Sequence, residues 1–162
     1  MSERPYVTLS CAMSIDGYLD SAAPPRVVMS NAADLDRVDE VRARHDAIMV
    51  GASTVRRDDP RLLVRDPARR ARRLSAGLSW SPAKVTVTAS GDLPANAAFF
   101  TTGDAPRIVY CPRDRERRLR GRLGERATVV GLGEQVTMSA VLDDLAGRGV
   151  RSLMVEGGGR VL

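Results

Sequence analysis

Two short turns of small residues could bind a phosphate group. "VGAST" (50–54) follows the apolar run "DAIM", and "VEGGGR" (155–160) follows the apolar run "SLM". Glycines in such turns let backbone N–H groups approach a phosphate, and the N-terminus of a following helix adds a favourable dipole. Neither turn matches a Walker sequence or G-x-G-x-x-G. Tight packing explains one such turn equally well, but two of them favour a ligand that carries phosphate.

Charged side chains near these turns could recognise an anionic ligand. The stretch "RRDDPRLLVR" (56–65) sets Asp58 and Asp59 among four arginines. Glu156 ends an apolar strand directly before the glycines, where a carboxylate is costly unless it has a polar partner. Arg42 could reach an anion from a predicted helix, although an ordinary surface position explains it equally well. An arginine suits phosphate because its planar fork donates two parallel hydrogen bonds.

Other classes of site are disfavoured. His45 is the only histidine, without the partners of a zinc cluster or a Ser–His–Asp arrangement. Its position at a predicted helix end favours a capping or surface role. Cys11 and Cys111 lie in apolar contexts, and we expect two buried thiols of a reducing compartment instead of a disulfide. We therefore expect no metal.

The chain is basic, with a net charge of +5 and a pI of about 10.0, which suggests anionic partners. The arginine clusters "ARRARR" (68–73) and "RDRERRLRGR" (113–122) contain no interleaved aromatic residues. Stacking platforms for single-stranded nucleic acid are therefore scarce. We interpret the two clusters as a solvated loop and a solvated helix face and expect no nucleic-acid partner.

The apolar pattern predicts an α/β fold in one domain over residues 1–162. Helices are predicted over 31–45, with Asn31 as the N-cap, and over 114–123 and 137–149. Between them we expect strands over 6–17, 26–30, 46–51, 84–90, 107–111, 127–131 and at the start of 150–162. Strands that alternate with helices imply a mostly parallel sheet with helices on both faces. Residues 60–82 are interpreted as a long loop with one extended piece at 62–64.

The chain stops at Leu162, directly after a glycine turn that would normally open a helix. We expect the C-terminal part of the fold to be missing, because the predicted sheet would otherwise keep an unpaired edge. No apolar run approaches the roughly 20 residues that span a bilayer. The N-terminal "MSERPYVTL" has no leader-like apolar region. A cytoplasmic protein without membrane contact is expected.

Three blocks of sequence resemble the riboflavin-pathway pyrimidine reductases: "RPYVTLSCAMSIDGYL", "NAADLDRVDEVRARHDAIMVGASTVRRDDPRLLVR" and "SLMVEGGGRVL". The middle block is the most specific, and the stretch 66–149 is the weakest match. The resemblance implies a dihydrofolate-reductase-like fold, a homodimer, and NADPH-dependent reduction of the ribosyl group of a phosphoribosylaminopyrimidine to the ribitylamino form.

The resemblance also implies roles for single residues. Asp58 and Glu156 are the carboxylates that could act in catalysis, by stabilising the ring-opened imine or managing its protons. Cofactor contacts are expected at Ala12, Val28, Thr54, Asp58, Ser90, Gly157, Gly158, Gly159, Arg160, Val161 and Leu162. Substrate contacts are expected at Arg26, Arg42, Leu62, Arg65 and Glu156.

Departures from the family pattern keep alternatives open. Ser10 stands where two-domain bacterial members often carry lysine, and it looks more like the stand-alone reductases, some of which act on a diaminopyrimidinone instead of an aminouracil. The zinc signature of the deaminase segment is absent. A second hypothesis is a reductase of a pterin, dihydrofolate or a specialised-metabolite heterocycle. A third is an arginine-rich nucleic-acid-binding module.

Overall fold

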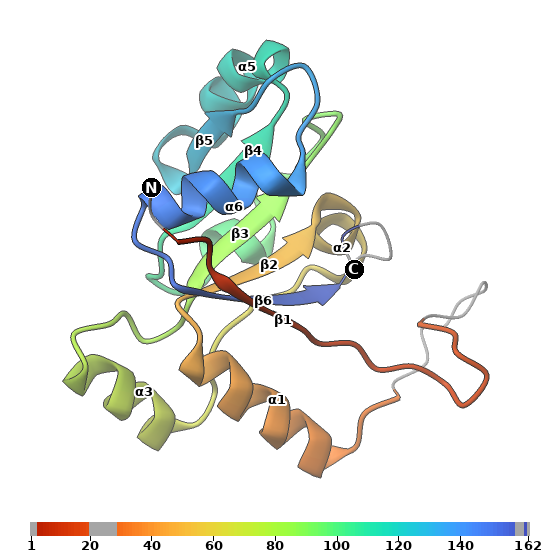
Figure 1. Ribbon diagram of the computed structural model, residues 1–162, viewed down its shortest axis with the longest axis vertical. Coiled ribbons are helices and arrows are strands. Elements are labelled where there is room, and N and C mark those ends of the chain that lie inside the picture. The colour runs from red at the N-terminus through yellow and green to blue at the C-terminus, as the bar shows by residue number, and fades with distance from the viewer. Residues whose placement is uncertain (1–2, 20–28, 158–160, 162) are drawn as a thin grey trace.

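Six parallel strands form one sheet in a computed structural model that describes residues 3–19, 29–157 and 161. The strand order is β1-β6-β2-β3-β4-β5, so β6 lies between β1 and β2 (Figure 1). The strands are β1 (Tyr6–Leu9), β2 (Ala47–Gly51), β3 (Ala83–Val87), β4 (Arg107–Cys111), β5 (Thr128–Gly131) and β6 (Ser152–Gly157). The predicted parallel α/β class is confirmed.

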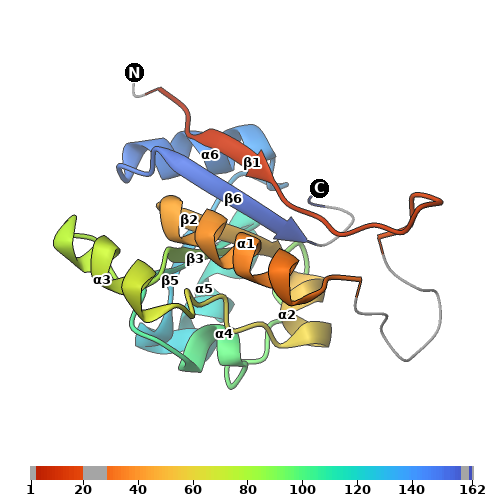
Figure 2. The ribbon, with the colours of Figure 1, turned by 90° about the horizontal axis from the view of Figure 1, so that it is seen from below.

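Helices cover both faces of the sheet. They are α1 (Ala32–Arg44), α2 (Ala52–Asp58), α3 (Pro67–Ser75), α4 (Ala98–Thr101), α5 (Arg113–Leu123) with the 3₁₀ turn η1 (Gly124–Arg126), and α6 (Met138–Gly147). Because side chains alternate along a strand, Ile48 and Val50 pack with α2, α4 and α5, whereas Ala47 and Met49 pack with α6. Figure 2 shows α6 on one side of the sheet and α1, α2, α4 and α5 on the other.

Helix α1 has the ends that its sequence predicts. The Asn31 side chain accepts a hydrogen bond from the Asp34 N–H at 2.9 Å, which satisfies one of the free donors of the first turn. His45 is the C-cap and only 7% exposed. Its Nδ1 lies 2.7 Å from the Val41 carbonyl oxygen, and its Nε2 lies 2.8 Å from Thr8 Oγ1. The capping role of His45 is confirmed, and the surface role is wrong.

The predicted loop over 60–82 is wrong because it contains helix α3. Asp66 is the N-cap and accepts from the Arg69 N–H at 2.9 Å, and Pro67 stands in the first turn, a favoured place for proline. The "ARRARR" cluster is therefore helical. Arg69 and Arg72 bind carboxylates of α1, partners that the local sequence does not reveal.

Three further expectations need correction. The first strand ends at Leu9 instead of continuing to the turn at Asp16 and Gly17, because the chain leaves β6 after the Ser10 N–H bonds the Val155 carbonyl at 2.8 Å. Cys11 is consequently exposed, whereas Cys111 is buried. Burial raises the pKa of the Cys111 thiol to about 11. Of the strand expected over 26–30, residues 26–28 lie outside the described residues and 29–30 form no strand.

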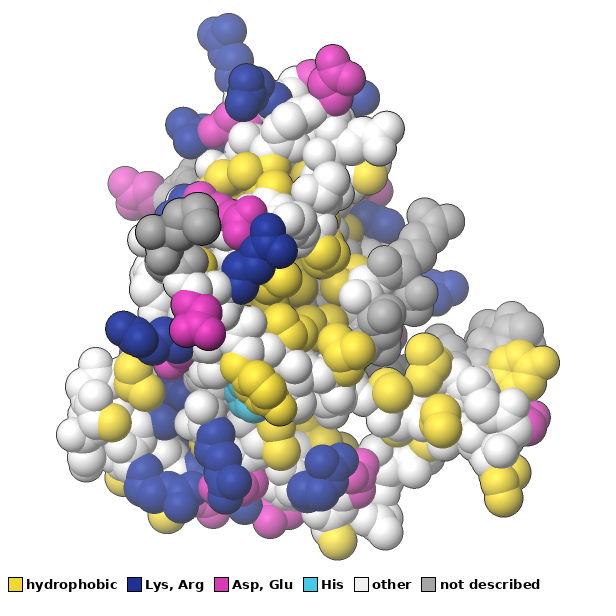
Figure 3. All heavy atoms as spheres, viewed as in Figure 1, with side chains coloured by type: hydrophobic (Ala, Val, Ile, Leu, Met, Phe, Trp, Pro, Cys, Tyr) yellow, Lys and Arg dark blue, Asp and Glu magenta, His cyan; other side chains and the backbone are white. Residues whose placement is uncertain are grey.

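The surface beside β1 is apolar. Tyr6 is 74% exposed and Leu9 is 60% exposed, and β1 pairs with β6 alone at this end of the sheet. Figure 3 shows apolar side chains gathered on the face of the molecule that carries α6. Within the described residues, no helix has both the length and the apolar character that a membrane span requires.

Candidate active site

The two small-residue turns meet at the carboxyl ends of β2 and β6. Val50 and Gly157 are register partners in the sheet, and α2 begins one residue after β2 ends. A Cβ atom on Gly157 would lie 3.9 Å from Thr54 Oγ1. Among the described residues, and apart from the chain neighbours of Gly157, only Thr54 Oγ1 lies within 4 Å of that position, so these residues leave the backbone open beside the Thr54 hydroxyl. Parallel sheets bind ligands at such a position, where neighbouring strands end and a helix begins.

Arg42 and Glu156 join α1 to the end of β6. Arg42 donates from Nε to Glu156 Oε1 and from Nη2 to Glu156 Oε2, both at 2.5 Å. The two side chains are only 18% and 10% exposed. Burial lowers the pKa of Arg42, but the hydrogen bond and charge of Glu156 outweigh burial and hold that pKa above its usual value. Two side chains that we expected at the substrate therefore hold each other in place.

Arg65 keeps much of its side chain at the surface. Its guanidinium donates from Nη2 to the Leu35 carbonyl at 2.8 Å, and its Nε lies 3.6 Å from Asp39 Oδ1. The side chain is 56% exposed. Arg42 approaches the same part of the chain, because its Nη1 donates to the Leu63 carbonyl at 3.3 Å. The two arginines thus flank one short segment.

Leu62 is buried, with 3% of its surface exposed, and belongs to the core on the α2 side. A substrate contact at this position would therefore come from the backbone. Its φ angle is 50°, a left-handed conformation that is unusual for a residue with a bulky side chain. Backbone strain of this kind is concentrated at functional sites.

The two adjacent aspartates occupy different positions. Asp58 is the last residue of α2 and is exposed. Asp59 is the C-cap, with a left-handed φ of 43°, and its Oδ1 accepts from the Ala98 N–H at 2.6 Å. Asp59 thus connects the end of α2 to the start of α4 and shapes the turn between them.

The other expected cofactor positions are more dispersed. Ala12 is exposed in the stretch after β1. Ser90 is exposed after β3, and its Oγ accepts from the Asp92 N–H at 3.2 Å. Val161 packs against the core on the α6 side. The remaining expected contacts lie outside the described residues: Arg26, Val28, Gly158, Gly159, Arg160 and Leu162.

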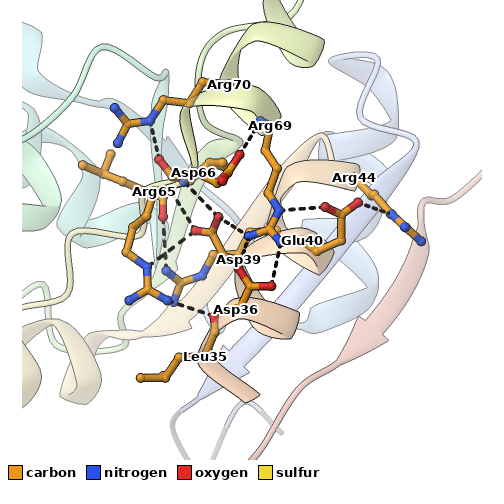
Figure 4. A network of polar contacts seen from close by, with 12 residues as sticks. Leu35, Asp36, Asp39, Glu40, Arg44, Arg65, Asp66, Arg69 and Arg70 are labelled. Atoms are coloured by element: carbon orange, nitrogen blue, oxygen red, sulfur yellow. Dashed lines mark hydrogen bonds and ion pairs between the residues drawn. The ribbon is translucent and has the colours of Figure 1, made fainter. Parts of the chain in front are cut away.

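Sequence reasoning missed Asp39. This carboxylate is 2% exposed and accepts hydrogen bonds from the Arg65 N–H at 2.7 Å, the Asp66 N–H at 3.2 Å and Arg69 Nη1 at 3.0 Å (Figure 4). Burial raises the pKa of Asp39, but these bonds outweigh burial and hold it below the usual value. The one available signal was spacing, since Leu35, Asp39 and Arg42 share a face of α1.

A metal centre finds no support in the described part of the chain, where no group of three or more His, Cys, Asp or Glu side chains could hold an ion.

Comparison with known proteins gives consistent matches in sequence. A family model described as the RibD C-terminal domain matches residues 5–162. A protein of Archaeoglobus fulgidus, named 2,5-diamino-6-ribosylamino-4(3H)-pyrimidinone 5′-phosphate reductase, is 37% identical over 160 residues, which are 98% of this chain and 73% of the relative. A Methanothermobacter thermautotrophicus protein of the same name is 35% identical over 156 residues, 96% of this chain and 68% of the relative.

Solved structures share the fold. A Thermotoga maritima diaminohydroxyphosphoribosylaminopyrimidine deaminase/5-amino-6-(5-phosphoribosylamino)uracil reductase aligns with a TM-score of 0.78 and 24% identity over 98% of this chain and 40% of that protein. A riboflavin biosynthesis reductase of Saccharomyces cerevisiae aligns with a TM-score of 0.71 and 20% identity over 98% of this chain and 65% of that protein. This chain thus spans less than two thirds of either protein.

Proposed function

Because the chain belongs to the RibD C-terminal domain family, we propose that it reduces the ribosyl group of a phosphoribosylaminopyrimidine to the ribitylamino form in riboflavin biosynthesis. The family resemblance expected from the sequence is confirmed. The observation that carries the proposal is the 37% identity, over 98% of the chain, to the Archaeoglobus fulgidus reductase. The protein is accordingly an oxidoreductase whose substrate is a small phosphorylated pyrimidine.

The favoured substrate is the diaminopyrimidinone. Three relatives at 31–37% identity carry the name of the diaminopyrimidinone phosphate reductase. Ser10, which looks more like the stand-alone reductases, bonds through its N–H to the carbonyl of Val155. That contact brings position 10 next to Glu156, a residue that we assign to the substrate.

The expected cofactor is NADPH, and the residues present fit a dinucleotide. The open backbone at Gly157 and the Thr54 hydroxyl beside it suit a phosphate that approaches the main chain closely. We assign Thr54, Asp58 and Gly157 to the cofactor, together with Ala12, Val28, Ser90 and residues 158–162. When bound, NADPH supplies the hydride that the reduction requires.

The protein's own residues supply position and protons. Reduction of the ring-opened imine forms a C–H bond at C1′ and an N–H bond at the neighbouring nitrogen, so one proton must reach that nitrogen. Glu156, fixed by Arg42, and Asp58, at the end of α2, are the carboxylates that we assign to this proton. Fixing Glu156 before the substrate arrives lowers the cost of reaching a reactive geometry.

The substrate phosphate is assigned to arginine. The Arg65 side chain is more than half exposed, and a guanidinium can donate paired hydrogen bonds to a phosphate. We place Arg26, Arg42 and the Leu62 backbone around the same ligand. We further propose a cytoplasmic homodimer. Its support is the apolar surface at Tyr6 and Leu9, and light scattering of the complete protein measures the assembly.

A turnover assay tests the function. The protein is incubated with NADPH and, in parallel, with the diaminopyrimidinone phosphate, the aminouracil phosphate or dihydrofolate, and NADPH oxidation is followed by absorbance. We expect the highest kcat/KM with the diaminopyrimidinone. Preference for dihydrofolate would favour the pterin-type reductase, and lack of saturable NADPH binding would reject both reductase hypotheses.

A further inference from the structure

The short segment over residues 59–66 connects α2 to α3 and contains neither helix nor strand after Asp58. Its shape is imposed by side chains from other elements. The Val64 N–H donates to Ser81 Oγ at 3.0 Å, and the Val64 carbonyl accepts from Arg70 Nε at 2.5 Å. Leu62 combines a left-handed backbone with a side chain that is buried in the core. The backbone of such a segment is expected to change conformation when one of these contacts is lost.

Asp39 fastens the end of this segment that carries Arg65. Its two carboxylate oxygens accept the consecutive N–H groups of Arg65 and Asp66, at 2.7 and 3.2 Å. A carboxylate that is 2% exposed is stable only when its oxygens are bonded. The pairing therefore constrains both partners, and it holds the backbone at Arg65 and Asp66 against α1.

The same carboxylate also orients the Arg65 side chain. Asp39 Oδ1 faces Arg65 Nε at 3.6 Å, while the Leu35 carbonyl, one helical turn earlier, accepts from Nη2 at 2.8 Å. Figure 4 shows the guanidinium lying along α1 beside these two residues. The guanidinium is thus aligned in advance, with more than half of the side chain still exposed.

Arg69 makes the arrangement possible. Its guanidinium binds Asp39, Asp36 and Glu40 at 3.0, 2.7 and 2.7 Å. The positive charge of Arg69 neutralises Asp39, so that Arg65 is not required for this purpose. The contacts of Arg69 with Asp36 lie at the surface, where Asp36 is 67% exposed, and in the described contacts Asp36 touches neither Arg65 nor Asp66.

We propose that Asp39 is the positioning residue for phosphate recognition: it sets the backbone and guanidinium of Arg65 so that this arginine meets the 5′-phosphate of the substrate. The inference rests on the proposed function. Asp39 itself touches no substrate. One face of α1 then serves both ends of the ligand, with Asp39 acting through Arg65 and Arg42 holding Glu156.

The test compares Asp39→Asn with Asp36→Asn, which also weakens the Arg69 network but leaves Arg65 alone. KM is measured with the pyrimidinone 5′-phosphate and with its dephosphorylated form, and Kd is measured for NADPH. For Asp39→Asn we expect a roughly tenfold higher KM for the phosphorylated substrate, with the other two values unchanged. Asp36→Asn should change none of them. Because KM does not depend on the folded fraction, a loss of stability alone does not imitate this pattern.

A double variant sharpens the test. If Asp39 acts through Arg65, then Asp39→Asn adds no further rise in KM to Arg65→Ala, because two groups in one pathway are not additive. An unchanged KM in Asp39→Asn, an equal change for both substrates, or additive effects would overturn the proposal. If Asp39→Asn does not fold, Asp39→Glu moves the carboxylate by one methylene, and an unchanged KM in that variant overturns it too. Lack of turnover by the unaltered protein would instead reject the proposed function, and the inference with it.

Discussion

Arg42 of α1 and Glu156 of β6 form a bidentate ion pair, with both N–O distances at 2.5 Å and both side chains largely buried. The pair fixes the carboxylate of Glu156 near the carboxyl end of β6. The expected roles of both residues change as well, because each already has a strong partner before any ligand binds.

Replacing Arg42 with methionine should destabilise the protein by about 3 kcal/mol, since a buried carboxylate then loses its partner. Chemical denaturation measures the loss. The matched control is the double variant with Glu156→Gln, which removes the orphaned charge and should recover part of the stability. A cost for Arg42→Met below about 1 kcal/mol, the range of an exposed pair, would mean that the pair contributes little.

Thr54→Val should weaken NADPH binding about tenfold by removing a hydroxyl while keeping the shape of the side chain. Ser53→Ala, on the exposed neighbour, is the control and should bind NADPH normally. Fluorescence titration gives both dissociation constants. Equal affinity in the two variants would remove Thr54 from the cofactor site.

Substitutions at Asp58 and Asp59 should affect different properties of the protein, kcat for Asp58 and stability for Asp59. Asp58→Asn should lower kcat with little change in stability. Asp59→Ala should cost about 1–2 kcal/mol of stability, because it loses the bond to the Ala98 N–H and puts a β-carbon without a polar group at a left-handed φ. Asp59→Asn retains an acceptor and tolerates that conformation, so it should remain near the unaltered stability. Kinetics and denaturation on all three variants separate the roles, and a loss of kcat in Asp59→Asn would contradict them.

Arg65→Ala should raise the KM of the phosphorylated substrate roughly a hundredfold, because a charge-assisted pair of hydrogen bonds is lost. The Kd of NADPH should change far less. The dephosphorylated pyrimidinone should be used equally well by both proteins. Arg61→Ala, an exposed arginine of the same segment, serves as the control. A parallel loss of substrate and cofactor binding would reject the assignment of Arg65.

Lys84 should make stability depend on pH. The side chain is fully buried and donates to the carbonyls of Phe99 and Thr102; burial first, and then the charge of Arg107, lower its pKa to about 8. Between that pH and about 10.4 the unfolded chain binds more protons at this site. Stability from Lys84 therefore rises with pH across the window, by about 2 kcal/mol.

The comparison with Lys84→Met isolates this effect. The raised pKa of Cys111 makes stability fall with pH in an overlapping range, so the unaltered protein alone gives no clear answer. The difference in unfolding free energy between the two proteins should increase from pH 8 to pH 10. A difference that stays constant would show that Lys84 does not titrate there.

Local signals in the sequence predicted what depends on local structure. The cap at Asn31, the stripe of α1 and the buried strand β2 follow from residue type and spacing. Helix α3 was missed although Asp66 and Pro67 are good start signals, because its arginine-rich composition suggested a loop. Two of its arginines, Arg69 and Arg72, are neutralised by carboxylates of α1, about 30 positions earlier in the chain.

In the candidate site, too, some features follow from local sequence and others depend on distant partners. The meeting of Thr54 with Gly157 could be anticipated, since both follow buried strands of a parallel sheet. The pairing of Arg42 with Glu156 and the burial of Asp39 could not, because each depends on a partner that only the folded chain brings near. Charged residues were read as ligand contacts or surface, and some of them are bonded to each other.

The insertion of β6 between β1 and β2 determines when the sheet can assemble. Tyr6 pairs with Ser152, so the first strand to leave the ribosome waits for the last described strand before it gains any neighbour. Pairings of such sequence separation slow folding and prolong the exposure of apolar strands. We infer that the newly made chain is vulnerable to aggregation until residue 157 has emerged, after which β6 joins β1 to β2 and brings Glu156 to the site.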